Sequence, residues 1–225
     1  YTDEGRDPEY WWFEKEVDAI VVDETIMAHQ PARYLAAGSL DAIAKFVEVH
    51  HNRGAFTPTS VPVDVYAAYH SAATTYELLN LFTEQACADV AEGKLTEAVH
   101  TVVFCNIALT GIISSMTRGR GQAALGHSFY NGLKTCFFDE THGYKHGELV
   151  GTGLLVQTAF DKNDELRSAV MSLLKKSNLP VTFAELGIVD KEEGVRKLAD
   201  YMENYDGIKD IPEGKKRLIA ALETL

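Results

Sequence analysis

Histidine is the residue type in this sequence best suited to metal or acid–base chemistry, and its distribution is uneven. Three of the eight histidines, His127, His142 and His146, fall in one glycine-rich stretch, residues 126–148. Glycine beside a histidine relieves crowding where a metal or ligand must approach the backbone. His142 and His146 are four residues apart, which would place two imidazoles on one face of a helix. The spacing leaves two alternatives open: a metal-binding pair, or solvated and hydrogen-bonded structural residues.

Asp41 is a second candidate, because it lies among small and apolar residues in the segment AAGSLDAIAKF. The break at Gly38 and Ser39 predicts that a helix begins near Leu40. A carboxylate at such a position can cap the helix and interact with its dipole. Alternatively, Asp41 binds a ligand together with side chains from elsewhere in the chain. The sequence around it does not decide between these roles.

Other catalytic motifs are either absent or poorly placed. Residues 119–124 read Gly-Arg-Gly-Gln-Ala-Ala, which fits the Gly-x-Gly-x-x-Ala form of a dinucleotide-binding loop. Such a loop should follow a short strand directly, whereas an apolar run of helical length precedes this one. The sequence has no Gly-x-Ser-x-Gly elbow, phosphate-loop Gly-Lys-Ser/Thr, His-Glu-x-x-His or His-Asp dipeptide. We therefore do not expect a nucleotide-binding loop at 119–124.

The elements that must position these residues are mainly helical. After Asp23 the apolar residues recur at helical spacing, which predicts a multi-helix bundle. Glycine and proline gather between the predicted helices, at Gly143, Gly147, Pro180 and Pro212. The predicted helices include residues 63–90, 96–116, 122–137, 164–176, 191–203 and 215–222.

The first residues have a different pattern. Residues 10–13 (Tyr-Trp-Trp-Phe) and 19–22 (Ala-Ile-Val-Val) are prone to form strands. Two short strands do not make a stable sheet, and a fully apolar run is typical of a buried parallel strand. We therefore expect residues 1–24 to be the remnant of an α/β domain that this chain lacks, and residues 25–225 to form an all-α domain.

Composition restricts the partners and the compartment. The 225 residues include 33 acidic and 21 basic side chains, a formal charge of −12 that disfavours binding to nucleic acid or to an anionic membrane. The longest apolar stretch, residues 101–116, is shorter than the roughly 18 residues a membrane span needs. Three cysteines, widely spaced, indicate neither a disulfide framework nor a cysteine zinc site. We expect a cytoplasmic protein, and the absence of an initial methionine suggests a piece of a longer one.

Several motifs, taken in order, resemble the C-terminal domain of the glycerol dehydrogenase branch of the metal-dependent, iron-containing alcohol dehydrogenase superfamily. The segment at 17–48 is similar to that family's domain junction and first metal-ligand helix. GHSFYNGL resembles its His-Ala-Ile-His-Asn-Gly segment, KHGELVGTGLLVQ its His-Gly-Glu segment, and NLPVTFAELGI a Leu-Pro-Val-Thr stretch near its C-terminus. The resemblance covers nearly the whole chain and implies a dehydroquinate synthase-like α-domain.

Carried over residue by residue, the resemblance implies that Asp41, His127 and His146 are the metal ligands. The iron-type branch has a further histidine four residues after the aspartate, where this chain has Lys45. A three-ligand site favours zinc, with iron or nickel as the other candidates. Tyr130 stands where the family often has a second histidine, and Leu40 replaces a small residue. His142 matches a variable position and is interpreted as structural.

The resemblance further implies hydride transfer between an alcohol and NAD or NADP, with the metal polarising the substrate hydroxyl. The substrate would be a small alcohol, a polyol or a hydroxy acid, and Arg118 and Arg120 could bind an anionic group on it. Without a nucleotide-binding domain the chain should be inactive, and its exposed surfaces favour a homo-oligomer. Two alternatives stay open: a stand-alone helical metal-dependent hydrolase, and a non-catalytic bundle whose histidines are packed.

Overall fold

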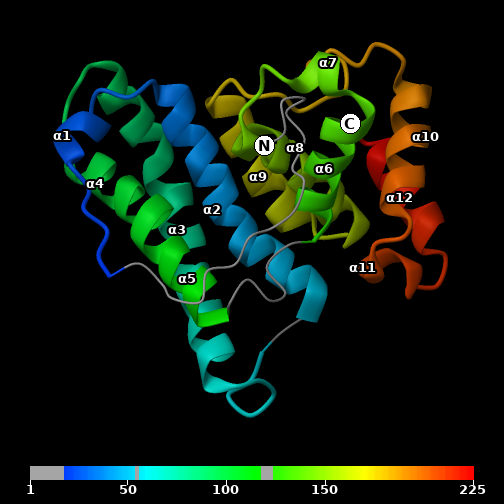
Figure 1. Ribbon diagram of the computed structural model, residues 1–225, viewed down its shortest axis with the longest axis horizontal. Helices are drawn as coiled ribbons and strands as arrows, with labels where there is room; N and C mark the ends of the chain where they lie inside the picture. The colour runs from blue at the N-terminus through cyan, green and yellow to red at the C-terminus, as the bar shows by residue number, and fades with distance from the viewer. Residues whose placement is uncertain (1–17, 54–55, 118–123) are drawn as a thin grey trace.

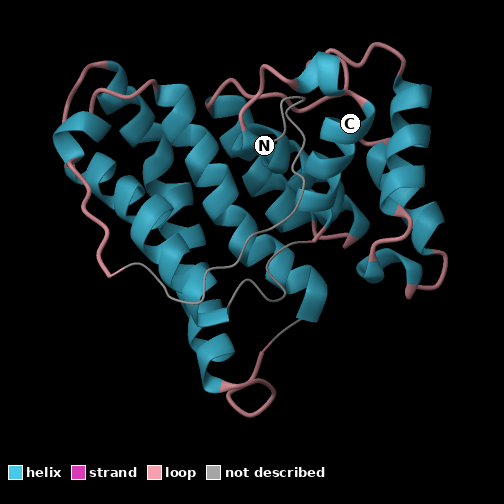
Figure 2. Ribbon diagram, viewed as in Figure 1, coloured by secondary structure: helices cyan, strands magenta, loops and turns pink. Residues whose placement is uncertain are grey.

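The computed structural model describes residues 18–53, 56–117 and 124–225, and in this part of the chain the regular structure is helical, with no strand (Figures 1 and 2). The predicted mainly α fold is confirmed. The elements are α1 (Glu24–Met27), α2 (Ala32–Arg53), α3 (Val63–Ala91), α4 (Glu97–Phe104), the π-helix η1 (Cys105–Leu109), α5 (Thr110–Thr117), α6 (Leu125–Cys136), α7 (Phe138–Thr141), α8 (His146–Phe160), α9 (Asp164–Lys176), α10 (Lys191–Met202), α11 (Asp206–Lys209) and α12 (Gly214–Leu222).

Helix α2 lies at the centre of the bundle and divides it into two halves. In Figure 1 it runs between a group formed by α3, α4 and α5 and a second group that contains α6, α8 and α9. Leu35, Leu40, Ile43 and Val47 are buried along it. Because α2 also carries several alanines, neighbouring helices can approach its backbone closely. Both halves of the core therefore depend on this helix.

Helix α8 is the most deeply buried element and crosses α2 at close range. All but two of its residues are buried, the exceptions being His146 at its start, which is exposed, and Ala159, which is partly exposed. A helix that is apolar on every side must be surrounded by other elements, and α2, α6, α9 and α12 pack around it. The sequence pattern had placed Gly147 between helices, and that interpretation is wrong because Gly147 lies in the first turn of α8.

Helix α2 also differs from the expected pattern. It continues without interruption through Gly38 and Ser39, so no helix begins near Leu40. The side-chain hydroxyl of Ser39 donates to the carbonyl of Leu35, which keeps this polar group satisfied inside the helix. Asp41 is consequently an interior residue of α2. Of the two roles that the sequence left open for Asp41, the N-terminal cap is therefore excluded.

The apolar segment after Thr96 forms the helical run that was predicted at residues 96–116, shifted by one residue. Helix α4, η1 and α5 are continuous from Glu97 to Thr117, a span of 21 residues that is long and apolar enough to cross a membrane by length and composition alone. The apolar stretch at residues 101–116, which was compared with the length of a membrane span, is only part of this run. Core helices of soluble proteins pass the same test, and this run packs against α2 and α3. Length therefore does not exclude a membrane span, and the absence of a membrane partner stays a prediction.

The predicted strand remnant is only partly described. Residues 10–13 lie outside the described residues. Residues 19–22 are in the described part of the chain, form no strand there and are exposed, with Val21 93% accessible. Helix α1 begins directly after them, with the Asp23 carboxylate accepting from the Thr25 backbone N–H. An exposed apolar run is compatible with a segment that pairs with strands outside this chain. The domain division at residue 24 stays a prediction.

Capping at the start of α10 provides a first test of the fold. The Asp190 carboxylate accepts from the Glu193 backbone N–H at 3.0 Å. We expect Asp190→Ala to lower the free energy of unfolding by about 1 kcal/mol, because an N–H at the helix start loses its acceptor. Guanidinium unfolding measures this loss. Asp190→Asn keeps an acceptor and should cost only a few tenths of a kcal/mol, so equal losses in both variants would contradict the capping role.

Candidate metal centre

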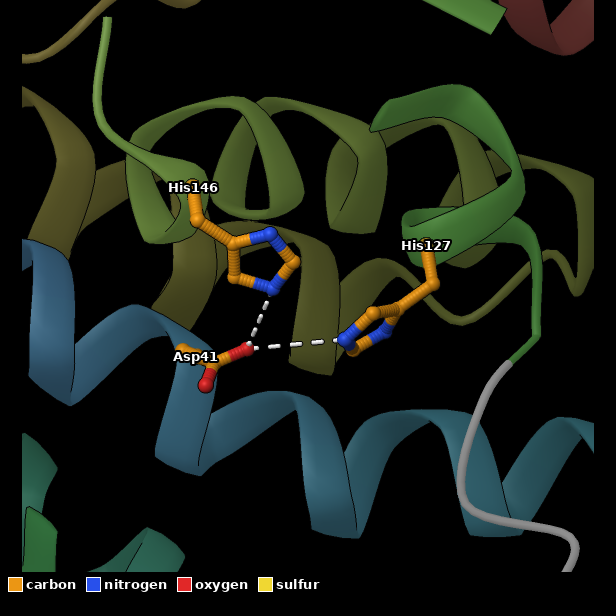
Figure 3. Close-up of side chains that lie close together, drawn as sticks. All are labelled: Asp41, His127 and His146. Carbon is orange, nitrogen blue, oxygen red and sulfur yellow. Dashed lines mark ion pairs between the residues drawn. The ribbon is translucent and has the colours of Figure 1, made fainter. Parts of the chain in front are cut away.

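Three side chains from three helices meet at one place beside α2. Asp41 comes from α2, His127 from α6 and His146 from the first residue of α8 (Figure 3). Asp41 Oδ1 lies 3.5 Å from His127 Nε2 and 3.2 Å from His146 Nε2. Each residue offers one ligand atom, and these atoms all lie within 4.8 Å of one another. The structure thus brings together the three residues that the sequence resemblance selected.

The chemistry of the cluster fits a divalent cation. Asp41 Oδ1 is buried and accepts no hydrogen bond from the described residues, although two imidazole nitrogens face it. A buried carboxylate oxygen normally has a partner, and a cation held between it and two imidazoles would supply one. The side chains of Asp41, His127 and His146 are 33%, 13% and 40% exposed. The cluster is therefore open to solvent on the His146 side.

The side chains of the cluster shift the pKa values of Asp41 and His127. Burial raises the pKa of the Asp41 carboxyl, but the contacts with His127 and His146 outweigh it and hold that pKa well below its usual range. Burial disfavours charged His127, yet Glu48 and Asp41 raise its pKa to about 9. A cation that binds at Nε2 of His127 must displace a proton from it, so metal affinity should depend on pH.

Glu48 was not selected by sequence reasoning, although it is in direct contact with the cluster. It is fully buried on α2, and its carboxylate accepts from His127 Nδ1 at 2.6 Å. The only signal in the sequence is its spacing, because residues seven apart in a helix, such as Asp41 and Glu48, share a face. An isolated glutamate in a helix would ordinarily be taken as solvated.

His146 is held by its position at the start of α8. Glu148, which is fully buried, accepts from the Lys145 backbone N–H at 2.8 Å and from Arg33 of α2 through both carboxylate oxygens. This bidentate pair ties the beginning of α8 to the beginning of α2. The ring of Tyr130 meets the ring of His146 edge-on, with centroids 4.3 Å apart. Tyr130, a departure from the family pattern, thus borders the cluster without belonging to it.

The other predicted candidates are placed differently. His142 lies at the end of α7, where its Nδ1 is 2.8 Å from the Asp139 carbonyl oxygen, so it does not share a helical face with His146. Of the two alternatives left open for these histidines, a metal-binding pair on one helical face is therefore excluded, and the contact of His142 agrees with its structural interpretation. Arg118 and Arg120 lie outside the described residues, as does most of the Gly-x-Gly segment.

Comparison with known proteins gives consistent relatives, although no family model matches the chain. The sequence is 31% identical over 203 residues to a glycerol dehydrogenase of Thermotoga maritima, covering 89% of this chain and 54% of that protein. It is 35% identical over 194 residues to a glycerol dehydrogenase of Pseudomonas putida, covering 84% of this chain and 51% of that protein. The chain thus spans about half the length of these curated relatives.

A solved structure supports the same relationship. The crystal structure of a probable glycerol dehydrogenase from Sinorhizobium meliloti 1021 superposes with a TM-score of 0.82 at 26% identity, covering 100% of this chain and 63% of that one. The relatives are oxidoreductases of the alcohol dehydrogenase type. More particularly, this chain is a homologue of the C-terminal part of the glycerol dehydrogenases, which confirms the resemblance found in its motifs.

Proposed function

We propose that Asp41, His127 and His146 bind one divalent cation and that this chain is the metal-binding catalytic part of an NAD(P)-linked polyol dehydrogenase. The observation that carries the proposal is the buried Oδ1 of Asp41, which accepts no hydrogen bond from the described residues while two imidazole Nε2 atoms face it. Homology to glycerol dehydrogenases supports the same assignment.

Zinc is the preferred cation. One carboxylate and two imidazoles leave a fourth tetrahedral position open, which is typical of catalytic zinc sites. Lys45 lies one helical turn after Asp41, at the position where the iron-type branch has a further histidine, and a protonated ammonium has no lone pair with which to bind a cation. Iron and nickel bind similar donor sets and are the alternatives.

The chain's own residues would hold the substrate alcohol next to the cation and keep it oriented. A bound divalent cation polarises an alcohol and stabilises its deprotonated form. The more exposed side, at His146, gives a small alcohol, polyol or hydroxy acid access to the cluster. A hydroxycarboxylate dehydrogenase from Escherichia coli, 29% identical over 188 residues, adds hydroxy acids to the polyols suggested by the glycerol dehydrogenases. Arg118 and Arg120 would bind a negatively charged group of such a substrate.

The nucleotide partner would come from outside this chain. Since the relatives are about twice as long, we propose that an N-terminal nucleotide-binding domain supplies the NAD(P) site and that the complete protein is a cytoplasmic homo-oligomer. The 225-residue chain alone should then bind the cation without oxidising glycerol. Turnover of glycerol by this chain with NAD or NADP would contradict the need for a second domain.

Metal analysis tests the proposal directly. After incubation with zinc and gel filtration, we expect one zinc ion per chain by atomic emission. A chain that retains no stoichiometric zinc, iron or nickel would contradict the proposal and favour a bundle with packed histidines. Zinc-dependent hydrolysis of esters or phosphoesters by the loaded chain would instead favour the hydrolase alternative.

A further inference from the structure

The buried carboxylate of Glu48 divides its two oxygens between the backbone and the ring of one segment. Oε1 accepts the backbone N–H of Ala124 at 2.8 Å and that of His127 at 2.9 Å. Oε2 accepts from His127 Nδ1 at 2.6 Å. A single side chain of α2 thus holds both the beginning of α6 and the imidazole that α6 carries.

The backbone contacts satisfy groups that a helix start leaves without partners. Ala124, the N-cap residue of α6, provides no side-chain cap. The Leu125 N–H is taken by Gln157 Oε1 of α8 at 3.1 Å, which is a second external cap. Gln157 anchors the same helix start, but its amide NH₂ donates to the Val47 carbonyl and not to the His127 ring. The two capping residues can therefore be compared with each other.

The contact to the ring determines which nitrogen can bind a cation. An ionised carboxylate only accepts hydrogen bonds, so Nδ1 must carry a proton. In the neutral imidazole the lone pair is then on Nε2, which faces Asp41. We propose that Glu48 is a positioning residue, which fixes His127 as the Nδ1–H tautomer and presents Nε2 to the cation. This inference rests on the proposed function, because it assumes a cation between the three side chains.

The substitution Glu48→Gln separates the two roles of the carboxylate, which are capping the start of α6 and accepting the hydrogen bond from His127 Nδ1. Two backbone N–H groups point at the position of Oε1, so the amide oxygen should remain there. The amide NH₂ then faces Nδ1 and donates to it, which moves the ring proton to Nε2. The helix start stays capped while the proton occupies the nitrogen that should bind the cation. We expect zinc affinity to fall about 10- to 100-fold, with only a small change in unfolding temperature.

Two readouts test this inference, and one needs no metal. The ¹⁵N shifts of the His127 ring, recorded on the metal-free chain at about pH 10 because its pKa is about 9, should report Nδ1–H in the wild type and Nε2–H in Glu48→Gln. Zinc affinity is measured by competition with a chromophoric chelator. An unchanged tautomer together with unchanged zinc affinity in Glu48→Gln would overturn the proposal.

Matched variants exclude a purely structural role. Gln157→Leu removes the other cap of α6 and should lower stability while leaving the His127 tautomer as Nδ1–H. Glu48→Asp remains an acceptor only and should keep that tautomer, with a zinc affinity between those of the wild type and Glu48→Gln. If Glu48→Gln does not fold, the Glu48→Asp variant decides. A His127 ring that carries its proton on Nε2 in that variant would overturn the proposal. A wild-type chain that binds no zinc would contradict the proposed function, whereas the nitrogen shifts would still decide the role of Glu48.

Discussion

Asp41→Ala is expected to lower zinc affinity by roughly three orders of magnitude, about 4 kcal/mol. Asp41 contributes the only carboxylate of the proposed ligand set, and its Oδ1 faces both imidazoles. Loss of a residue that only orients a ligand typically costs 10- to 100-fold in metal affinity, so loss of a charged ligand should cost more. Chelator competition and metal analysis of the purified chain measure the effect.

His142→Ala is the matched control for this prediction. His142 is close in sequence to His146, but it lies at the end of α7 and contacts the Asp139 carbonyl instead of the cluster. Its replacement should leave zinc affinity within about twofold of the wild type, since an exposed side chain away from a site rarely matters. Equal losses in Asp41→Ala and His142→Ala would contradict a specific ligand role for Asp41, and unchanged affinity in Asp41→Ala would mean that zinc binds elsewhere. The melting temperature of each metal-free variant shows whether it is folded.

Helices with an amphipathic pattern and a clear cap were predictable from the sequence alone. The expected segment 164–176 matches α9 because Asn163 caps it and its apolar residues lie on one face. The segment 63–90 matches α3 for another reason, since α3 has no side-chain cap but is a long alanine-rich stretch that begins directly after Pro62. For such helices the local sequence already contains the capping and burial signals that determine where they begin and end.

Helix α8 was not among the predicted segments for the opposite reason. It is buried on all sides, so its sequence has no apolar–polar alternation to reveal a period. It also contains Gly147, Gly151 and Gly153, which lower helix propensity and read as breaks. These glycines are instead places where α8 touches other helices, and such contacts are a tertiary property that local patterns do not contain.

In the candidate site, too, local sequence predicted some features and missed those that depend on tertiary contacts. The spacing of His142 and His146 raised a metal-binding pair as one alternative, but α7 ends at Thr141 and α8 begins only at His146, so the two do not share a helix and only His146 reaches the cluster. The set Asp41, His127 and His146 came from the family resemblance, which carries information about three-dimensional proximity. Glu48 was missed because a glutamate in an apolar helix gives no sign of what it contacts. Its partners on α6 are 76 to 79 residues away in sequence.

The crossing of α2 and α8 is expected to be highly sensitive to Gly147→Ala. A Cβ at residue 147 would lie 1.9 Å from the Ala37 carbonyl oxygen and 2.7 Å from its carbon. These are backbone atoms, so no side-chain rotation relieves the overlap and the two helices must separate. We expect the free energy of unfolding to fall by about 3 kcal/mol or more, measured by guanidinium unfolding.

The same separation should affect the proposed metal centre, because Gly147 follows His146 directly and Asp41 lies one turn after Ala37 on α2. Moving α8 away from α2 lengthens the distance between His146 Nε2 and Asp41 Oδ1, now 3.2 Å, so zinc affinity should fall together with stability.

Gly111→Ala is the control, since a Cβ there meets nothing within 4 Å and should stabilise α5 by about 0.5–1 kcal/mol. If Gly147→Ala were as stable as the wild type, α2 and α8 could not cross as closely as described. If a destabilised Gly147→Ala chain kept the zinc affinity of the wild type, zinc binding would not depend on the close crossing of α2 and α8.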